Sequence, residues 1–514
     1  MSRHRPVSLS FGLAGWFLVS AMAVTTDASQ PYPQPYMVKD INPAPGASGS
    51  PMLGRVVDGK IFFNADDGVH GRELWVTDGT TWGTFMVKDI YPWAEYTYPD
   101  AMTAVAGRLF FQADDGVHGN ELWVSNGTAA GTFLVKDIHP TSDSDPGDVI
   151  STNGPMTDWN GIAAFAADDG VHGRELWISD GTEEGTVMVK DIYPGVRPSG
   201  AWYLTTLGGM LLFSASDGTH GRELWKSDGT VEGTVLVKDI YPGSFNSGPG
   251  QLTNVNGLVF FSARDAFYNL ELWKSDGTGE GTVMVKDIDP SFQSEPSCLT
   301  NVEGTLFFAA YDENDDLELW KSDGTEEGTV RVKDINPSGS SLPVMNDNGN
   351  VDGMLYFTAE DGTHGREPWI SDGTEEGTVM LKDINPFGES RAGGWIKVSG
   401  TIYFSADDGT HGKEIWITDG TEEGTMLAHD IFPGPEGSWP GLGFQIEGVL
   451  IFRADDGVNG RELWALDPNR GPIPAVSDWA ITVMALLLLS GGSIVIARRR
   501  ARNVKEMSGP LCGP

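Results

Sequence analysis

The chain is poor in cysteine and in basic residues, and each shortage excludes a class of site. Only 2 of its 514 residues are cysteines, Cys298 and Cys512, and they lie on opposite sides of an apolar segment near the C-terminus. A four-cysteine zinc site is therefore excluded, and an intramolecular disulfide is not expected. The 34 Lys and Arg residues face 72 Asp and Glu residues, which gives a net charge of -38. Such a chain repels phosphates, so we expect no nucleic-acid partner.

The chain also lacks the short motifs that mark common catalytic centres. It has no G-x-S-x-G, no H-E-x-x-H and no P-loop sequence. Carboxylates are so numerous that no single pair stands out as an acid and a base. We therefore predict no catalytic residue, and an extracellular enzyme acting on polysaccharide is kept as an alternative.

Both ends of the chain carry features of an exported protein. Basic residues in Met1–Arg5 precede an apolar stretch, Phe11–Val19, and an A-x-A site, Ala21–Ala23. This pattern predicts a signal peptide over residues 1–23, followed by a linker over 24–36. The alternative is an N-terminal membrane anchor.

The C-terminal end predicts one transmembrane helix. Residues Trp479–Ala497 are uncharged and long enough to span a bilayer, and Arg498, Arg499 and Arg500 follow directly. The positive-inside rule places the tail, residues 503–514, in the cytoplasm and the bulk of the chain outside. We therefore expect an exported protein that is displayed on the cell surface or envelope, or released.

Ile473, Pro474 and Trp479, with the membrane span and the arginine cluster, resemble the IPTLxxWG C-terminal sorting signals of Gram-negative bacteria. The resemblance covers residues 475–502 together with the preceding motif. It implies the secretion machinery and an exosortase-like protease as partners. Ala475, Val476 and Ala480 replace the Thr, Leu and Gly of that signal, so a plain membrane anchor is the alternative.

The remainder of the chain is a repeat with a period near 48 residues. An ELW-type triplet recurs nine times, and its tryptophan falls at Trp75, Trp123, Trp177, Trp225, Trp273, Trp320, Trp369, Trp416 and Trp464. A fixed period of this length marks a repeat architecture. No helical periodicity is visible within it.

One repeat predicts four antiparallel strands. They are expected at Gln251–Val255, Leu258–Ala263, Glu271–Ser275 and Thr282–Ile288, and Asn256-Gly257 is a strong hairpin signal. The last unit stops at Trp464–Asp467 without a fourth strand. An orphan fourth strand, Met37–Pro43, precedes the first unit.

These complementary ends predict a closed ring. We expect an all-β chain with a β-propeller of about nine four-stranded blades over residues 37–467, closed by the N-terminal strand, and a linker at 468–474. His429-Asp430-Ile431 is read as a variant fourth strand. The alternatives are an open stack of repeats or two smaller propellers.

The pattern ELWxSDGTxxGTxxVKDI resembles the ELWxxDGT repeat of bacterial exported proteins. The resemblance covers residues 37–467. It implies no activity, because that family has none established.

We expect each repeated residue type to have its own role. The nine tryptophans are predicted to fill the space between blades. SDGT at Ser227–Thr230 is predicted to be a self-satisfied turn. Paired aspartates precede the triplet, and their oxygens suit Ca²⁺, with a tight turn as the alternative. These weak metal candidates are Asp66, Asp67, Asp114, Asp115, Asp168, Asp169, Asp407, Asp408, Asp455 and Asp456.

The loop that carries these aspartates is expected on the same rim as the variable connectors between blades, where binding residues usually lie. Its ligand-face candidates are His70, His118, His172, His220, His364, His411, Tyr268 and Asp315. The last two mark segments, Arg264–Asn269 and Tyr311–Asp316, that depart from the repeat, either by drift or as a specialised patch. We expect a scaffold for binding or adhesion to a surface glycan, matrix or protein, assisted by Ca²⁺. A structural surface-layer component is a further alternative.

Overall fold

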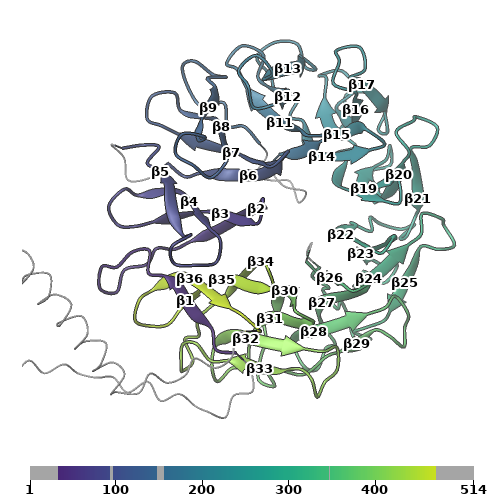
Figure 1. The fold of residues 1–514 in the computed structure, drawn as a ribbon. Coiled ribbons are helices and arrows are strands. Elements are labelled where there is room, and N and C mark those ends of the chain that lie inside the picture. The colour runs from purple at the N-terminus through teal and green to yellow at the C-terminus, as the bar shows by residue number, and fades with distance from the viewer. Residues whose placement is uncertain (1–32, 93–96, 148–155, 346–347, 470–514) are drawn as a thin grey trace, which may run out of the picture.

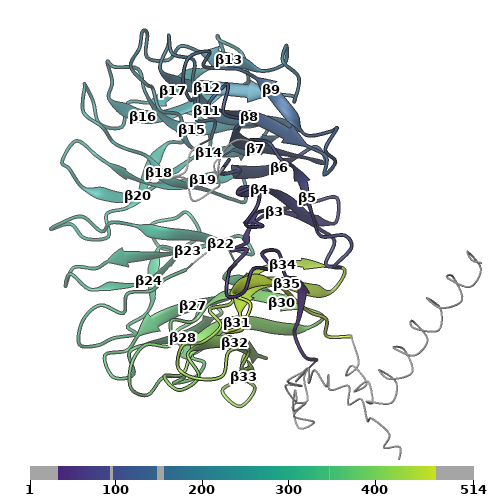
Figure 2. The ribbon, with the colours of Figure 1, turned by 90° about the vertical axis from the view of Figure 1, so that its left-hand side faces the viewer.

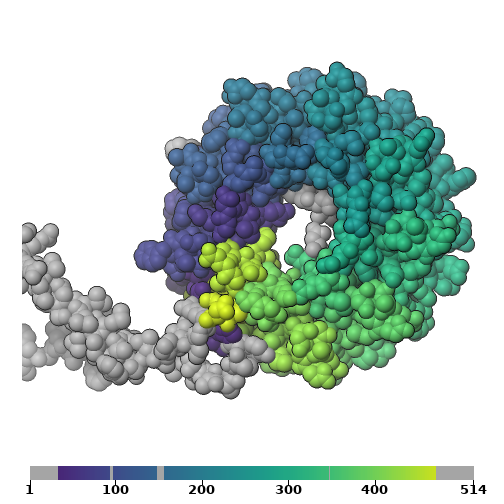
Figure 3. All heavy atoms as spheres, turned by 45° about the vertical axis from the view of Figure 1, so that its right-hand side comes forward, coloured from purple at the N-terminus to yellow at the C-terminus, as the bar shows by residue number. Residues whose placement is uncertain are grey.

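A computed structural model describes residues 33–92, 97–147, 156–345 and 348–469, and the regular secondary structure in these ranges consists of β-strands alone. Its thirty-six strands form nine four-stranded antiparallel sheets. The sheets follow one another as blades around a central opening (Figure 1). The space-filling view shows the same ring of blades and the opening (Figure 3). The predicted nine-bladed β-propeller is confirmed, and the open stack and the pair of smaller rings are wrong.

Each blade runs from the central opening outwards. The innermost strands are β2 (Met52–Val57), β6 (Asp100–Val105), β10 (Thr157–Trp159), β14 (Trp202–Leu207), β18 (Gly250–Val255), β22 (Ser297–Val302), β26 (Asn350–Val351), β30 (Gly393–Val398) and β34 (Gly441–Ile446). The second strands are β3 (Lys60–Asp66), β7 (Arg108–Asp114), β11 (Ile162–Asp168), β15 (Met210–Ser216), β19 (Leu258–Arg264), β23 (Thr305–Tyr311), β27 (Met354–Glu360), β31 (Thr401–Asp407) and β35 (Val449–Asp455).

The outer half of each blade holds the triplet strand and the edge strand. The third strands are β4 (Arg72–Thr77), β8 (Asn120–Ser125), β12 (Arg174–Ser179), β16 (Arg222–Ser227), β20 (Leu270–Ser275), β24 (Leu317–Ser322), β28 (Arg366–Ser371), β32 (Lys413–Thr418) and β36 (Arg461–Leu466). The outer strands are β5 (Phe85–Lys88), β9 (Phe133–Lys136), β13 (Val187–Lys190), β17 (Val235–Lys238), β21 (Val283–Lys286), β25 (Val330–Lys333), β29 (Val379–Met380), β33 (Met426–His429) and β1 (Tyr36–Lys39). The strand limits predicted for the fifth blade agree with β18 to β21 within two residues at each end.

The second strands show why a blade cannot stand alone. In β19 the five residues Val259–Ala263 are all buried, so both faces of the sheet are covered. A strand with two covered faces has a continuous apolar run instead of an alternating pattern. Each blade must therefore pack against a neighbour on both sides.

The core consists of nine apolar clusters, each shared by two consecutive blades. Between the fourth and fifth blades, Leu212 and Leu224 meet Val259, Phe261 and Trp273. The triplet tryptophans lie in these interfaces, where their large flat rings fill the space between two sheets.

In eight blades, a lysine on the outer strand or just after it joins the blade to the next. Lys238 Nζ lies 6.0 Å from the centroid of the Trp273 ring and donates to the Thr282 carbonyl at 2.6 Å. Lys39, Lys88 and Lys286 stand over the tryptophan of the following blade in the same way. At the junction of the eighth and ninth blades, His429 of β33 stands at the sequence position of this lysine. Burial lowers the pKa of His429 to about 4, so its ring stays neutral near pH 7.

The N-terminal strand closes the ring. β1 pairs antiparallel with β36, so that Met37 lies opposite Trp464. Lys39 Nζ then donates to the Thr84 carbonyl of the first blade at 2.8 Å. The junction between the ends therefore repeats the contacts found at most of the other junctions, and no sheet edge is left unpaired there.

Replacing an interface tryptophan is expected to destabilise the ring strongly. W273A should lower the free energy of unfolding by about 3–5 kcal/mol, because it removes a large ring from a packed interface. Trp82, which is 95% exposed in a turn of the first blade, supplies the control. W82A should change the free energy by less than about 0.5 kcal/mol. Chemical denaturation measures both, and equal effects would contradict an interface role for Trp273.

Candidate functional site on the connector rim

Two kinds of loop form one rim of the ring, which we call the connector rim. They are the turns between the second and third strands of each blade and the connectors from one blade to the next. Gly248 N of a connector donates to the Arg222 carbonyl at 3.1 Å, and Arg264 N donates to the Ser247 carbonyl at 2.8 Å. The connector is thus held between the third strand of one blade and the second strand of the next. In the view turned by 90°, β13 lies at the top of the ring and β33 at the bottom (Figure 2).

In the regular turn, an aspartate and a histidine are hydrogen-bonded to each other. Asp67 Oδ1 accepts from the backbone N–H groups of Val69 and His70, and His70 Nδ1 lies 2.8 Å from Asp67 Oδ2. The hydrogen bond to Asp67 raises the pKa of His70. Burial pulls the pKa of Asp67 upwards, but the hydrogen bonds from His70 outweigh it, so the pKa of Asp67 lies below its ordinary value.

The pair recurs wherever the histidine is present. It is found in His118–Asp115, His172–Asp169, His220–Asp217, His364–Asp361 and His411–Asp408, at 2.7 or 2.8 Å. Asn459 replaces the histidine in the last blade and donates to Asp456 at 2.7 Å. All six predicted histidines therefore lie on the connector rim, each within its own turn.

The predicted metal aspartates also lie in these turns, and their oxygens already accept hydrogen bonds. Asp66 Oδ1 accepts from Gly68 N at 2.7 Å, and the first aspartates Asp114, Asp168, Asp407 and Asp455 repeat this contact. The second aspartates behave as Asp67 does. In the described ranges, no group of three or more His, Cys, Asp or Glu could hold a metal ion. The calcium site stays a prediction.

The SDGT segment forms a turn on the opposite rim. Asp228 Oδ1 accepts from Thr230 N at 2.9 Å and from Thr230 Oγ1 at 2.7 Å. These two bonds lower the pKa of Asp228. The carboxylate satisfies the backbone of its own turn.

The glutamate of the triplet holds the connector rim in place, although it was not among the site residues predicted from the sequence. Glu223 is fully buried. It accepts from Ile240 N at 2.8 Å, from Ser247 N at 3.0 Å and from Ser247 Oγ at 2.6 Å. The carboxylate therefore ties the third strand of its blade to both ends of the connector. All nine glutamates are fully buried: Glu73, Glu121, Glu175, Glu223, Glu271, Glu318, Glu367, Glu414 and Glu462.

The sequence contained a signal for this role. A carboxylate stands at the same position of all nine triplets, in strands that are otherwise mostly apolar. Buried charges must be paired or hydrogen-bonded, so such a residue needs a fixed set of donors. Burial raises the pKa of Glu223 to about 7, although the hydrogen bonds from Ser247 and Ile240 oppose the shift.

The fifth blade departs from the regular turn. Ala266 and Asn269 replace its two glycines, and Tyr268 stands at the histidine position with a φ of 68°. Asp265 keeps its role, because its Oδ1 accepts from Phe267 N at 2.8 Å and from Asn269 N at 3.2 Å.

Regular turns need glycine because the preceding connector packs against them. A Cβ on Gly218, which has a φ of 78°, would lie 2.4 Å from the Tyr193 ring. In the fifth blade the positive φ shifts to Tyr268, and in the sixth it shifts to Asp315, with a φ of 64°. The two departures predicted from the sequence therefore share one altered turn conformation.

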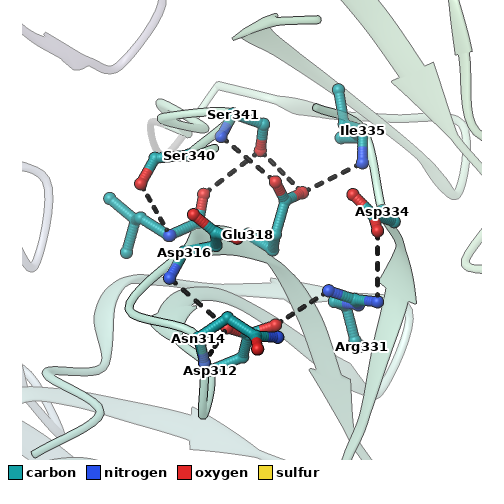
Figure 4. A network of polar contacts seen from close by, with 10 residues as sticks. Asp312, Asn314, Asp316, Glu318, Arg331, Asp334, Ile335, Ser340 and Ser341 are labelled. Atoms are coloured by element: carbon teal, nitrogen blue, oxygen red, sulfur yellow. Dashed lines mark hydrogen bonds and ion pairs between the residues drawn. The ribbon is translucent and has the colours of Figure 1, made fainter. Parts of the chain in front are cut away.

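The sixth blade replaces the histidine by an arginine from another strand. Arg331 of β25 donates to Asp312 Oδ2 at 2.8 Å and also lies 3.5 Å from Asp334 (Figure 4). Asp312 Oδ1 accepts from Asn314 N and Asp316 N. The aspartate of the turn thus keeps a cationic partner although the histidine is lost.

Two shallow cavities lie away from the connector rim. One of about 270 Å³ is lined by inner-strand residues that include Arg55, Thr103 and Thr157. The other, of about 390 Å³, lies between the seventh and eighth blades and is lined by Asp352, Lys397 and other residues. Lys397 Nζ donates to Asp352 there.

The predicted sorting and targeting segments fall outside the described residues, as do Ile473, Pro474, Trp479, Arg498, Arg499 and Arg500. Within the described ranges, no helix has the length and apolar character needed to cross a membrane.

No family model and no curated protein matches the chain. Among solved structures, it is similar to two structures of a puromycin hydrolase at 13% identity, with TM-scores of 0.35 and 0.33 and coverage of 82% and 73% of this chain. It is also similar to a structure from a study of two prolyl endopeptidases, at 13% identity and a TM-score of 0.38 over 78% of this chain. Oligopeptidase B from Leishmania major matches 61% of this chain at 11% identity and a TM-score of 0.36. The chain spans 61% of both puromycin hydrolase chains, 52% of the endopeptidase and 45% of oligopeptidase B. TM-scores this low support no functional conclusion.

Thermal stability is expected to fall as the pH rises from about 5 to about 8. The pKa of Glu223 is raised from 4.5 to about 7, so the folded state binds more protons than the unfolded state in this window. The raised pKa of His70 acts in the same direction, since its contribution is complete below pH 6.5 and is lost as the pH rises through the folded pKa. Calorimetry at constant ionic strength measures the melting temperature. A flat or rising melting temperature between these pH values would contradict the prediction.

Removing one triplet carboxylate is expected to weaken the connector. E223Q should lower the free energy of unfolding by about 1–3 kcal/mol, because the amide group of glutamine then faces hydrogen-bond donors. Glu232 is exposed in a turn of the same blade, so E232Q is the matched control. Urea denaturation measures both variants. An E223Q protein as stable as E232Q would rule out this role for the glutamate.

Proposed function

We propose that the chain is an exported propeller whose connector rim binds a macromolecular ligand. The ligand is a surface glycan, a matrix component or another protein. The ring supplies a rigid frame, and the connectors supply the variable contacts. The cell surface or envelope is the proposed location, with the C-terminal segment as anchor or sorting signal and an exosortase-like protease as processing partner.

The distribution of exposed apolar side chains carries this proposal. On the connector rim these side chains are Val69, Tyr98, Val117, Val171, Val196, Phe245, Phe267, Tyr268, Phe292, Phe387, Trp439 and Val458. Among the described residues, the turns between third and fourth strands on the opposite rim expose only Trp82 and Val231, and the apolar residues that begin eight of the outer strands are exposed by 36% to 44%. Exposed apolar surface gathered on one face is typical of an interaction site.

An extracellular polysaccharide-active enzyme is the second candidate. Such an enzyme needs acidic groups with shifted pKa values that can reach a substrate. The described carboxylates with a pKa near 7 are triplet glutamates, and they are buried beneath connectors with their oxygens hydrogen-bonded to donors. This placement favours the binding function. A surface-layer component is the third candidate.

Calcium is included in the proposal as an assisting ion at the aspartate turns. The test is a melt of the full chain with CaCl₂ and then with excess EDTA. An ion that binds only the folded state raises the melting temperature, so an unchanged midpoint would remove calcium from the proposal.

A panel of immobilised ligands tests the binding function. The full chain is applied to chitin, cellulose, alginate, peptidoglycan and collagen, together with two variants. One variant carries V69S, V171S, F387S and V458S on the connector rim, and the other carries W82S on the opposite rim. We expect at least one panel member to retain the native chain and W82S but to release the rim variant.

The same panel can overturn the proposal. Retention of no member, or equal loss in W82S and the rim variant, would contradict a ligand site on the connector rim. Release of soluble sugar from a panel member would support the enzyme instead. A regular lattice of the purified chain in electron micrographs would support the surface-layer component.

A further inference from the structure

The connector rim carries one cluster of aromatic side chains that the repeat does not explain. It consists of the contacting rings of Tyr241, Phe245 and Tyr268, together with the exposed Phe267 that precedes Tyr268 in the same turn, and we call these four residues the aromatic patch. The Tyr241 ring stacks on Phe245 at 4.9 Å and meets Tyr268 edge-on at 5.4 Å. The first two come from the connector of the fourth blade, and the other two come from the altered turn of the fifth.

The patch is open to solvent. Phe245, Phe267 and Tyr268 are 52%, 84% and 61% exposed, whereas Tyr241 beneath them is buried. Aromatic rings that are this exposed bury little apolar surface on folding, so they contribute little to the free energy of unfolding. Tyr268 also adopts a φ of 68°, which is unfavourable for a bulky side chain. The patch therefore adds little to the stability of the ring, and its exposed rings are available to a ligand.

Most of the charges around the patch are negative. In the fifth and sixth blades Leu270 and Leu317 replace the arginine that follows the regular turn, but in the fifth blade Arg264 takes the place of the first aspartate. The sixth turn adds Glu313, Asp315 and Asp316. The fifth turn therefore keeps one carboxylate, Asp265, beside Arg264, and the added negative charge of this sector lies in the sixth turn.

The carboxylates of the fifth blade lie close enough to act on one another. Burial raises the pKa of Asp287, and the nearby charges of Asp265 and Asp289 raise it further. Asp265 also acts on Tyr241, whose pKa is raised to about 12, mainly by a hydrogen bond with Tyr268. Negative charge thus borders the aromatic rings directly.

We propose that the aromatic patch docks cationic side chains of a protein segment rich in arginine and lysine. This inference rests on the proposed binding function and names its ligand class and site. A cation over an aromatic face is attracted by the ring, and the attraction is strongest for a planar guanidinium that also stacks. Neighbouring carboxylates and the net charge of -38 draw such a segment towards the rim. A neutral glycan, which also stacks on aromatic rings, would gain nothing from these carboxylates as charges.

Peptide binding to the full chain tests the proposal. Fluorescently labelled octa-arginine and octalysine are titrated with the native chain, with F267S, with F267S/Y268N and with the control W82S. Asparagine tolerates a positive φ, so the double variant keeps the turn. We expect octa-arginine to bind more tightly than octalysine. The double variant should weaken octa-arginine about tenfold, as the loss of cation–π contacts implies. F267S should have an intermediate effect, and W82S none.

None of these variants changes the charge of the chain, so the comparison isolates the aromatic contribution. Equal affinities for the native chain and the double variant would overturn the proposal, because binding would then be general attraction between opposite charges. Binding of a neutral chitin hexasaccharide that depends on Phe267, with no such dependence for octa-arginine, would overturn the cationic ligand. The rim variant of the ligand panel leaves the aromatic patch intact, so failure of the broader function is seen separately.

Discussion

A buried carboxylate in every blade is the interaction on which the ring depends. The triplet glutamate joins one blade to the next, because its carboxylate accepts hydrogen bonds from both ends of the connector between them. At the closure, Glu462 accepts from Ile41 N at 2.9 Å, across 421 residues of sequence. A buried charge without donors would cost several kcal/mol. The connector backbone must therefore return to the same place in each blade, whatever its side chains are.

Besides the glutamates, the interfaces between blades stabilise the ring. No single blade can cover its own two faces, so stability comes from nine shared clusters and from the lysine contacts across most junctions. A repeat of this kind normally leaves two exposed ends. Here the N-terminal strand β1 supplies the missing fourth strand of the last blade, and the ends become one more interface of the same type.

This division of labour explains how the connector rim can vary without loss of the fold. The backbone of each connector is held by the glutamate, in most blades by a serine, and by the neighbouring strands, so its exposed side chains can change without loss of these contacts. The fifth and sixth blades extend this freedom to the turn itself. The aspartate is kept in both blades, as Asp265 and Asp312, and the glycines, histidine and arginine are lost. One blade gains exposed aromatic rings, and the other gains the Arg331 contact and further carboxylates.

The sequence by itself determined the repeat, the four strands of each blade and the closure of the ring. These depend on local patterns and on a count of units, and the period is visible in the tryptophans alone. It also singled out Tyr268 and Asp315 as departures. Only the tertiary structure decided what the triplet glutamates do, because the isoleucine that follows the outer strand and the donors in the connector meet the third strand only in the folded blade. It also decided that Tyr241 and Phe245 meet Tyr268, since residues of two blades become neighbours only when the sheets pack. The identity of a ligand depends on such contacts between blades, which no single repeat contains.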